Sequence, residues 1–328
     1  MYESPFHRTD LSNYSFLITG GAGFIGSNIV QYLIKHNAGK VRVLDNFSTG
    51  SRENVQEFID NPAFELMEGD IRDLEMCRAA VDGVDFVSHQ AALGSVPRSI
   101  NDPITTNEVN ISGFLNMLVA ARDQKVKRLI YAASSSTYGD HIGLPKVEDA
   151  IGKPLSPYAI TKYVNELYAG IFSEVYGFHA LGLRYFNVFG PRQDPFGPYA
   201  AVIPLFIKAA LDNDAPYING DGTISRDFTF VENAVQANIR ALFKENLNRH
   251  EVINVACGES ISLNDLWTSI TAIESKEIKP IYRQERKGDI KHSLADVTKG
   301  KDLIGYIPSV KVKEGLSFTY SWYKTTKR

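Results

Sequence analysis

The chain has 328 residues, 44% of them hydrophobic, and a formal net charge of −3 at pH 7. This length allows one large domain or two modest ones, and the charge excludes a general nucleic-acid-binding surface. Only Cys77 and Cys257 are cysteines, which favours a reducing compartment without disulfides or a structural zinc site. Because no apolar run reaches transmembrane length and residues 1–13 are polar, we expect a cytoplasmic protein that contacts no membrane and binds no metal.

The first predicted elements enclose a glycine-rich turn. Phe16–Thr19 is an apolar run typical of a strand, and Ile25–Ile34 has the apolar period of a helix. Between them, Gly20, Gly23 and Gly26 follow a GxxGxxG spacing, one residue wider than GxGxxG. A strand, a glycine turn and a helix in this order can hold a pyrophosphate at the helix N-terminus. A glycine turn without a ligand is the alternative.

An acidic residue follows the second predicted strand. Val41–Leu44 forms this strand and Asp45 comes next, about 20 residues after the last glycine. A carboxylate at this position accepts hydrogen bonds from the adenosine ribose and repels a 2′-phosphate, so it favours NAD over NADP. Arg52 lies nearby in the sequence and is the feature that would suit NADP.

Strand and helix signals continue to alternate through the first half of the chain. The predicted strands are Phe64–Met67, Val84–His89, Arg128–Ala133 and Ala180–Arg184, and the predicted helices are Leu74–Val81, Asn107–Gln124 and Tyr158–Tyr176. This alternation predicts an α/β fold with a doubly wound parallel sheet, in which ligands bind beyond the carboxyl ends of the strands. Polar residues follow these strands at Asp70, Gln90, Ser134 and Asn187.

The pattern changes after Gly190, where Pro- and Gly-rich loops begin. We expect a smaller α/β C-terminal domain from this point, with Phe228–Ala256 returning a helix and a strand to the first domain. The predicted division assigns residues 1–190, with 228–257, to an NAD-binding domain. Residues 191–227 and 258–328 then form a substrate-binding domain.

Tyr158 and Lys162 are four residues apart within a predicted helix, so they lie on the same face. An ammonium group beside the phenol favours the phenolate and lowers a pKa that is about 10 when unperturbed. Such a tyrosine can take a proton from an alcohol while a nicotinamide takes the hydride. YxxxK alone is also common on ordinary amphipathic helices, so the motif depends on its context.

Three longer segments supply that context. They are Asp45-Asn46-Phe47-Ser48-Thr49-Gly50, the stretch from Ala132 to His141, and Arg184-Tyr185-Phe186-Asn187-Val188-Phe189-Gly190. With them, the chain from Ser15 to Trp322 resembles the extended short-chain dehydrogenase/reductase family, and within it the bacterial UDP-N-acetylglucosamine 4-epimerases. The resemblance implies a Rossmann-type fold, bound NAD and a UDP-sugar substrate. It also implies a homodimer, in which the helix that carries YxxxK pairs with the preceding long helix.

The resemblance implies roles for individual residues. Ser134, Tyr158 and Lys162 would be catalytic, with Ser134 relaying the sugar O4 proton to Tyr158 and Lys162 also holding the nicotinamide ribose. The residues expected to bind the cofactor are Gly20, Gly23, Phe24, Ile25, Gly26, Asp45, Asn46, Ser48, Thr49, Gly50, Asp70, Ile71, Gln90, Ala91, Ala92, Asn110, Tyr158, Lys162 and Tyr185. The residues expected to bind the substrate are Ser135, Ser136, Asn187, Ala201, Val202, Arg226, Arg286, Asp289 and Ser293.

Two of these positions bear on the reaction. Related 4,6-dehydratases carry an acid and a base where this chain has Ser135 and Ser136, because elimination needs both, and related decarboxylases carry a glutamate in the same stretch. The absence of these acidic and basic side chains at Ser135 and Ser136 favours epimerisation, in which oxidation at C4 is followed by return of the hydride to the other face. The 4-keto sugar would turn between the two steps while the nucleotide stays bound.

The preferred sugar depends on the space around C2. Strict UDP-galactose 4-epimerases carry a tyrosine where this chain has Ser293, so we expect UDP-GlcNAc and UDP-GalNAc to be preferred. UDP-GlcNAcA/UDP-GalNAcA and UDP-Glc/UDP-Gal are further substrates to consider. The alternatives are a UDP-glucuronate 4-epimerase, another NAD-dependent sugar-nucleotide oxidoreductase such as a 4-reductase, and a non-enzymatic dinucleotide sensor. Sensors of this superfamily usually lose the Tyr or the Lys, and this chain keeps both.

Overall fold

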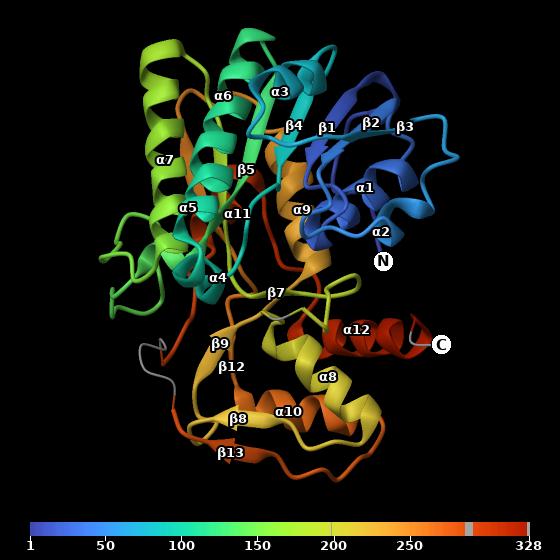
Figure 1. Cartoon of the computed structure of the whole chain (residues 1–328), viewed down its shortest axis with the longest axis vertical. Coiled ribbons are helices and arrows are strands. Elements are labelled where there is room, and N and C mark those ends of the chain that lie inside the picture. The colour runs from blue at the N-terminus through green and yellow to red at the C-terminus, as the bar shows by residue number, and fades with distance from the viewer. Residues whose placement is uncertain (198, 286–290, 327–328) are drawn as a thin grey trace.

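The protein is built around a seven-stranded, fully parallel sheet (Figure 1). The computed structural model describes residues 1–197, 199–285 and 291–326. The strands are β1 (Ser15–Thr19), β2 (Lys40–Asp45), β3 (Phe64–Glu68), β4 (Phe86–His89), β5 (Arg128–Ser134), β6 (Leu181–Tyr185) and β11 (Glu251–Val255). They lie in the order β11-β6-β5-β4-β1-β2-β3, so the direction of winding reverses between β1 and β4. The predicted doubly wound sheet is confirmed, and this reversal is where such sheets bind ligands.

Helices cover both faces of the sheet (Figure 1). They are α1 (Phe24–Lys35), α2 (Glu53–Gln56), α3 (Leu74–Val81), α4 (Val96–Asn101), α5 (Pro103–Asn107), α6 (Phe114–Asp123), α7 (Pro157–Tyr176), α9 (Val231–Leu242) and α11 (Thr298–Ile304). Successive strand residues point to opposite faces, so Phe16 and Ile18 pack in the core with α1 and α9. Leu17 between them packs in the core with α3, α6 and α7.

The predicted helix Asn107–Gln124 differs from the structure. A six-residue π-helical segment, η2 (Glu108–Gly113), separates α5 from α6. Within it the Asn110 side chain accepts a hydrogen bond from Leu93 N at 2.8 Å and donates to Leu93 O at 3.1 Å. The apolar period of a sequence does not reveal a π-helical turn, and such turns are often found beside functional sites.

The remaining elements form a smaller region below the sheet in Figure 1. They are β7 (Val188–Phe189), α8 (Val202–Asp212), β8 (Tyr217–Asn219), β9 (Ser225–Asp227), β10 (Thr229–Phe230), β12 (Ser260–Ser262), α10 (Leu263–Ala272), β13 (Ile281–Arg283) and α12 (Val312–Thr326). The short strands pair as β7 with β10, β9 with β12 and β8 with β13. Phe206, Trp267 and Leu316 belong to a separate core in this region.

Between β10 and β12 the chain returns to the large sheet, as expected for Phe228–Ala256. α9 packs on the sheet and β11 pairs with β6. Ile304 and Tyr306 join the same core, so α11 also contacts the sheet region. We retain the two-domain division near Gly190 as a proposal, with α11, β7 and β10 as its exceptions. No helix in the described ranges has the length and apolarity needed to cross a membrane.

Candidate active site

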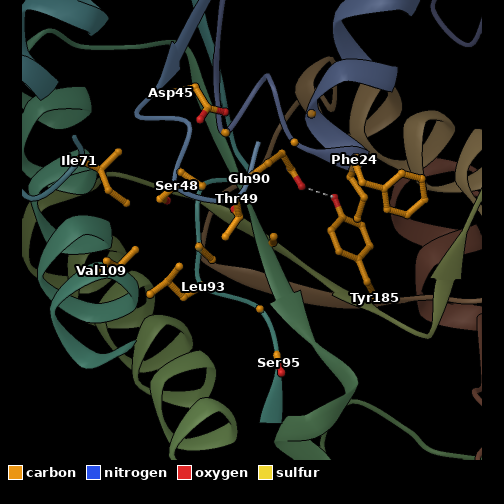
Figure 2. Close-up of a pocket in the computed structure, with 18 of the residues that line it drawn as sticks. Phe24, Asp45, Ser48, Thr49, Ile71, Gln90, Leu93, Ser95, Val109 and Tyr185 are labelled. Atoms are coloured by element: carbon orange, nitrogen blue, oxygen red, sulfur yellow. Dashed lines mark hydrogen bonds between the residues drawn. The ribbon is translucent and has the colours of Figure 1, made fainter. Parts of the chain in front are cut away.

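A cavity of about 580 Å³ opens at the carboxyl ends of the strands (Figure 2). Most of the residues expected at the cofactor and the reacting sugar line it: Gly20, Gly23, Phe24, Ile25, Gly26, Asp45, Asn46, Ser48, Thr49, Asp70, Ile71, Gln90, Ala91, Ala92, Ser134, Tyr158, Lys162, Tyr185, Asn187 and Ala201. These residues come from the carboxyl ends of strands β1 to β6 or from the loops and helices that follow them. The strand-end rule therefore brings together residues far apart in the sequence.

The glycine turn leaves no space for side chains. A Cβ on Gly26 would lie 2.2 Å from Gly20 O, and one on Gly20, whose φ is +67°, would lie 2.7 Å from Ala91 N. α1 starts directly after Gly23, and no side chain caps it. Its first N–H groups therefore have no partner within the helix and border the cavity, which suits a pyrophosphate.

Asp45 lies buried at the end of β2, next to this turn. Its carboxylate accepts hydrogen bonds from Ala22 N at 2.9 Å and Phe47 N at 2.8 Å. Burial raises its pKa, and these two bonds lower it again. Each carboxylate oxygen keeps a further lone pair for a ribose hydroxyl. Arg52, the residue that would suit NADP, is instead bonded to Glu68 at 2.5 Å. The glycine cradle and the carboxylate fit NAD.

Asp70 follows β3 at the same end of the cavity. It is bound by Asn46 Nδ2 at 2.8 Å and by the guanidinium of Arg72 at 2.7 Å. The bond to Arg72 is the main reason why the pKa of Asp70 falls to about 2. Asp70 is therefore ionised at neutral pH and fixes the side chain of Asn46.

The three residues expected to be catalytic meet at the opposite end of the cavity. Ser134 ends β5, while Tyr158 and Lys162 occupy the first two turns of α7. Ser156 caps this helix, because its hydroxyl accepts from Ala159 N at 3.1 Å. Lys162 Nζ donates to Ala132 O at 2.9 Å and lies 6.0 Å from the centre of the Tyr158 ring.

The pKa of Tyr158 differs from the expectation. Burial raises it above the usual value, while a hydrogen bond with Ser134 lowers it in part. Burial also lowers the pKa of Lys162 to about 8. Lys162 is therefore not among the groups that lower the phenol pKa in this structure, since burial disfavours both charges and the ammonium is bonded to a carbonyl. The group that does lower it is Ser134.

Several expected residues do not line the cavity: Gly50, Asn110, Ser135, Ser136, Val202, Arg226 and Ser293. Asn110 lies behind the cavity wall and holds the backbone of Leu93, which does line it. Ser136 binds Ser134 Oγ through its own hydroxyl at 2.9 Å. Arg226 and Ser293 lie together, since Ser293 N donates to Ser225 O at 3.1 Å. Arg286 and Asp289 lie outside the described residues.

Other residues line the cavity without having been expected there: Leu44, Gly69, Leu93, Gly94, Ser95, Val109, Ala132, Ala133, Val188 and Gln193. Leu93, Gly94 and Ser95 continue the loop after β4 and could have been found by extending the strand-end rule. Val109 and Gln193 had no such signal, because they reach the cavity from η2 and from the loop after β7.

Comparisons with known proteins agree with this geometry. A model of the NAD dependent epimerase/dehydratase family matches residues 16–256. The structure of UDP-N-acetylglucosamine 4-epimerase from Methanobrevibacter ruminantium M1, in complex with UDP-N-acetylmuramic acid, is 40% identical with a TM-score of 0.90, and the match covers 95% of this chain and 99% of that one.

Two further relatives carry different activities in their names. The structure of UDP-glucuronic acid 4-epimerase from Bacillus cereus, with UDP-glucuronic acid and NAD, is 30% identical with a TM-score of 0.88, covering 95% of this chain and 99% of that one. The UDP-glucose 4-epimerase of Mycolicibacterium smegmatis is 33% identical over 94% of this chain and 98% of that protein. The chain belongs to the NAD-dependent epimerase/dehydratase family, its cofactor is NAD, and the resemblance to extended short-chain dehydrogenases/reductases is confirmed.

Proposed function

We propose that this chain is an NAD-dependent UDP-sugar 4-epimerase that prefers UDP-GlcNAc and UDP-GalNAc. One observation carries the proposal. Ser134, Tyr158 and Lys162 line the same cavity as the glycine turn, and the only carboxylates among the described lining residues are Asp45 and Asp70, at the ends of β2 and β3. The described cavity therefore offers a base for O4 but no carboxylic acid–base pair beside it for elimination.

Each catalytic residue then has a task. Tyr158, assisted by Ser134, accepts the O4 proton and later returns it. Lys162 holds a positive charge near the phenolate, and its bond to Ala132 O fixes its position at the end of β5. Bound NAD accepts the C4 hydride and gives it back. Between these steps the 4-keto sugar turns, so the residues that hold the nucleotide must supply most of the binding energy.

The two serines that follow Ser134 support epimerisation over the dehydration and decarboxylation that related enzymes catalyse. Ser135 and Ser136 form the short helix η3 (Ser135–Tyr138) with Ser134 as its N-cap. Ser136 bonds to Ser134 through both its N–H and its hydroxyl. These contacts order the Ser134 hydroxyl for proton transfer. Neither serine can act as the carboxylate that dehydration or decarboxylation needs.

Substrate contacts are proposed on both sides of the cavity. Asn187 and Ala201 line it, and Asn187 is held by a bond from its Nδ2 to Asp227 O at 2.9 Å. The remaining substrate contacts that the motifs imply would come from Ser135, Ser136, Val202, Arg226, Arg286 and Asp289. Ser293 is small and lies next to the Arg226 strand, which supports the acceptance of an acetamido group at C2.

Incubation of the purified protein with UDP-GlcNAc, UDP-GlcNAcA, UDP-Glc and UDP-GlcA, without added NAD, tests the proposal. ¹H NMR should show the C4 epimer of UDP-GlcNAc forming fastest. Parallel samples with added NAD control for lost cofactor. Fastest turnover of UDP-GlcA would favour a UDP-glucuronate 4-epimerase instead. No turnover of any sugar, with NAD bound, would favour a non-enzymatic dinucleotide sensor.

A homodimer belongs to the same proposal. The outer face of α7 exposes apolar side chains, among them Ile160, Leu167, Ile171 and Val175. Their spacing of seven and four residues places them on one stripe of the helix. Ile104 on the neighbouring α5 is also exposed. Pairing of this face with the same face of a second copy would bury the stripe.

A further inference from the structure

Two cavity-lining side chains, Gln90 and Tyr185, are held from behind by a residue that does not line the cavity. Tyr185 donates its hydroxyl hydrogen to Gln90 Oε1 at 3.1 Å, as Figure 2 shows. Asn238 of α9 is fully buried, and its Nδ2 donates to the Tyr185 hydroxyl at 2.7 Å. Gln90 Nε2 completes a ring by donating to Asn238 Oδ1 at 3.0 Å. Ser88 joins this ring through Gln90 Nε2 and Asn238 Oδ1.

The direction of every bond in this ring follows from one backbone carbonyl. Ala234 O can only accept, and it lies 2.7 Å from Asn238 Nδ2, so this atom must be the amide nitrogen. Asn238 Oδ1 then faces Gln90, whose nearer atom must be its donating nitrogen. Gln90 Oε1 therefore faces Tyr185, and the phenol must donate to it.

The ring therefore leaves Tyr185 without a hydroxyl hydrogen to offer a ligand. That hydrogen is committed to Gln90, and one lone pair of the oxygen accepts from Asn238. Burial also raises the pKa of Tyr185, although the bond that the phenol accepts from Asn238 acts in the opposite direction. Tyr158, the other tyrosine in the cavity, lacks such a clamp among the described contacts and bonds with Ser134 instead. The two phenols are thus prepared for different tasks.

We propose that Asn238 is a positioning residue: it locks Tyr185 and Gln90 as a neutral, fixed wall of the NAD pocket, leaving Tyr158 as the single phenol that exchanges protons. Asn238 acts from helix α9, so the segment that returns to the large sheet after β10 contributes to the cofactor site. This inference rests on the proposed function, in that it takes the cavity as the NAD site.

The test compares Asn238→Leu with Asn233→Leu. Asn233 is a matched control, because it lies on the same helix, is equally buried and makes a similar number of amide bonds. Its partners are Ser309 and Val310, away from the cavity. The readout is the rate at which purified holoenzyme exchanges bound NAD for labelled NAD, at a temperature where circular dichroism shows all variants folded. Asn238→Leu should exchange about tenfold faster than wild type, and Asn233→Leu at the wild-type rate.

A double-mutant cycle asks whether Asn238 acts through Tyr185. The variants are Asn238→Leu, Tyr185→Phe and the two combined, with the same exchange readout. If Asn238 only serves to hold the Tyr185 hydroxyl and Gln90, the double variant should exchange no faster than the faster single variant. Multiplying effects, or equal exchange in Asn238→Leu and Asn233→Leu, would overturn the inference. Wild-type protein that holds no NAD at all would instead overturn the proposed function.

Discussion

At the scale of single residues, the proposed function makes turnover depend on Tyr158. Burial raises its pKa, and only the deprotonated phenol accepts the O4 proton, so kcat should fall as the pH drops. Tyr158→Phe should lower kcat by a factor of about 10² to 10⁴ while NAD stays bound. Tyr163→Phe, on the same helix, should keep wild-type kcat. NMR turnover assays between pH 6 and 9 measure both the pH dependence of kcat and the effect of Tyr158→Phe. Lys162 also titrates in about this range. Undiminished kcat in Tyr158→Phe would exclude Tyr158 as the base.

Ser293 carries the prediction about the sugar. Ser293→Tyr adds a ring beside the Arg226 strand, where Ser293 N is bonded to Ser225 O. We expect turnover of UDP-GlcNAc to fall by a factor of about 10 to 100, because the ring takes the space of the acetamido group, while UDP-Glc turnover stays within a few-fold. Ser293→Ala is the control and should keep both activities. Equal loss of both activities in Ser293→Tyr would mean that this position does not select the C2 group.

Single residues also show where prediction from the sequence ends. Asp45, Gln90 and Ser134 were found because each follows a strand, and parallel strands bring their carboxyl ends to one edge. Gln193 and Asn238 follow no strand of the large sheet, so only tertiary packing places them at or behind the cavity. The raised pKa of Tyr158 was missed for a similar reason, since helix spacing gives the distance to Lys162 but not the depth of burial.

At the scale of elements, Asp227 ties three segments of the smaller region together. Its carboxylate accepts from Cys257 N at 2.9 Å, Gly258 N at 3.1 Å and Ala295 N at 3.1 Å. Asp227→Asn would turn an NH₂ group toward at least one of these N–H groups. We expect it to lower the free energy of unfolding by about 3 kcal/mol, measured by denaturant unfolding. Asp302→Asn, an exposed carboxylate on α11, is the control and should have little effect.

The same residue predicts a pH dependence of stability. Burial raises the pKa of Asp227 to about 7, above the value of about 4 expected in the unfolded chain. Its contribution to stability is therefore complete below about pH 4 and is lost as the pH rises through about 7. The free energy of unfolding should depend less on pH in Asp227→Asn than in wild type across this range. An unchanged pH dependence in the variant would show that Asp227 is not the titrating group.

Among elements, those of the large sheet were predictable and those of the smaller region were not. Central strands of the large sheet are buried on both faces, so β1 and β5 contain continuous apolar runs, Phe16–Ile18 and Leu129–Tyr131, that stand out from their neighbours. The pairs β7–β10, β9–β12 and β8–β13 have strands of two or three residues, too short for a period to develop. Their positions depend on the separate core around Trp267, which the sequence does not reveal before the fold is known.

At the scale of the whole molecule, the exposed stripe of α7 predicts the state of association. Ile171 is 52% exposed in the middle of this stripe, and a charge at the centre of an apolar interface costs far more than the same charge in water. We therefore expect wild-type protein to sediment as a dimer at micromolar concentrations and Ile171→Glu to sediment as a monomer. Ile142→Glu changes an even more exposed isoleucine away from α7 and should remain dimeric. A monomeric wild type, or a dimeric Ile171→Glu, would place any subunit interface elsewhere than on α7.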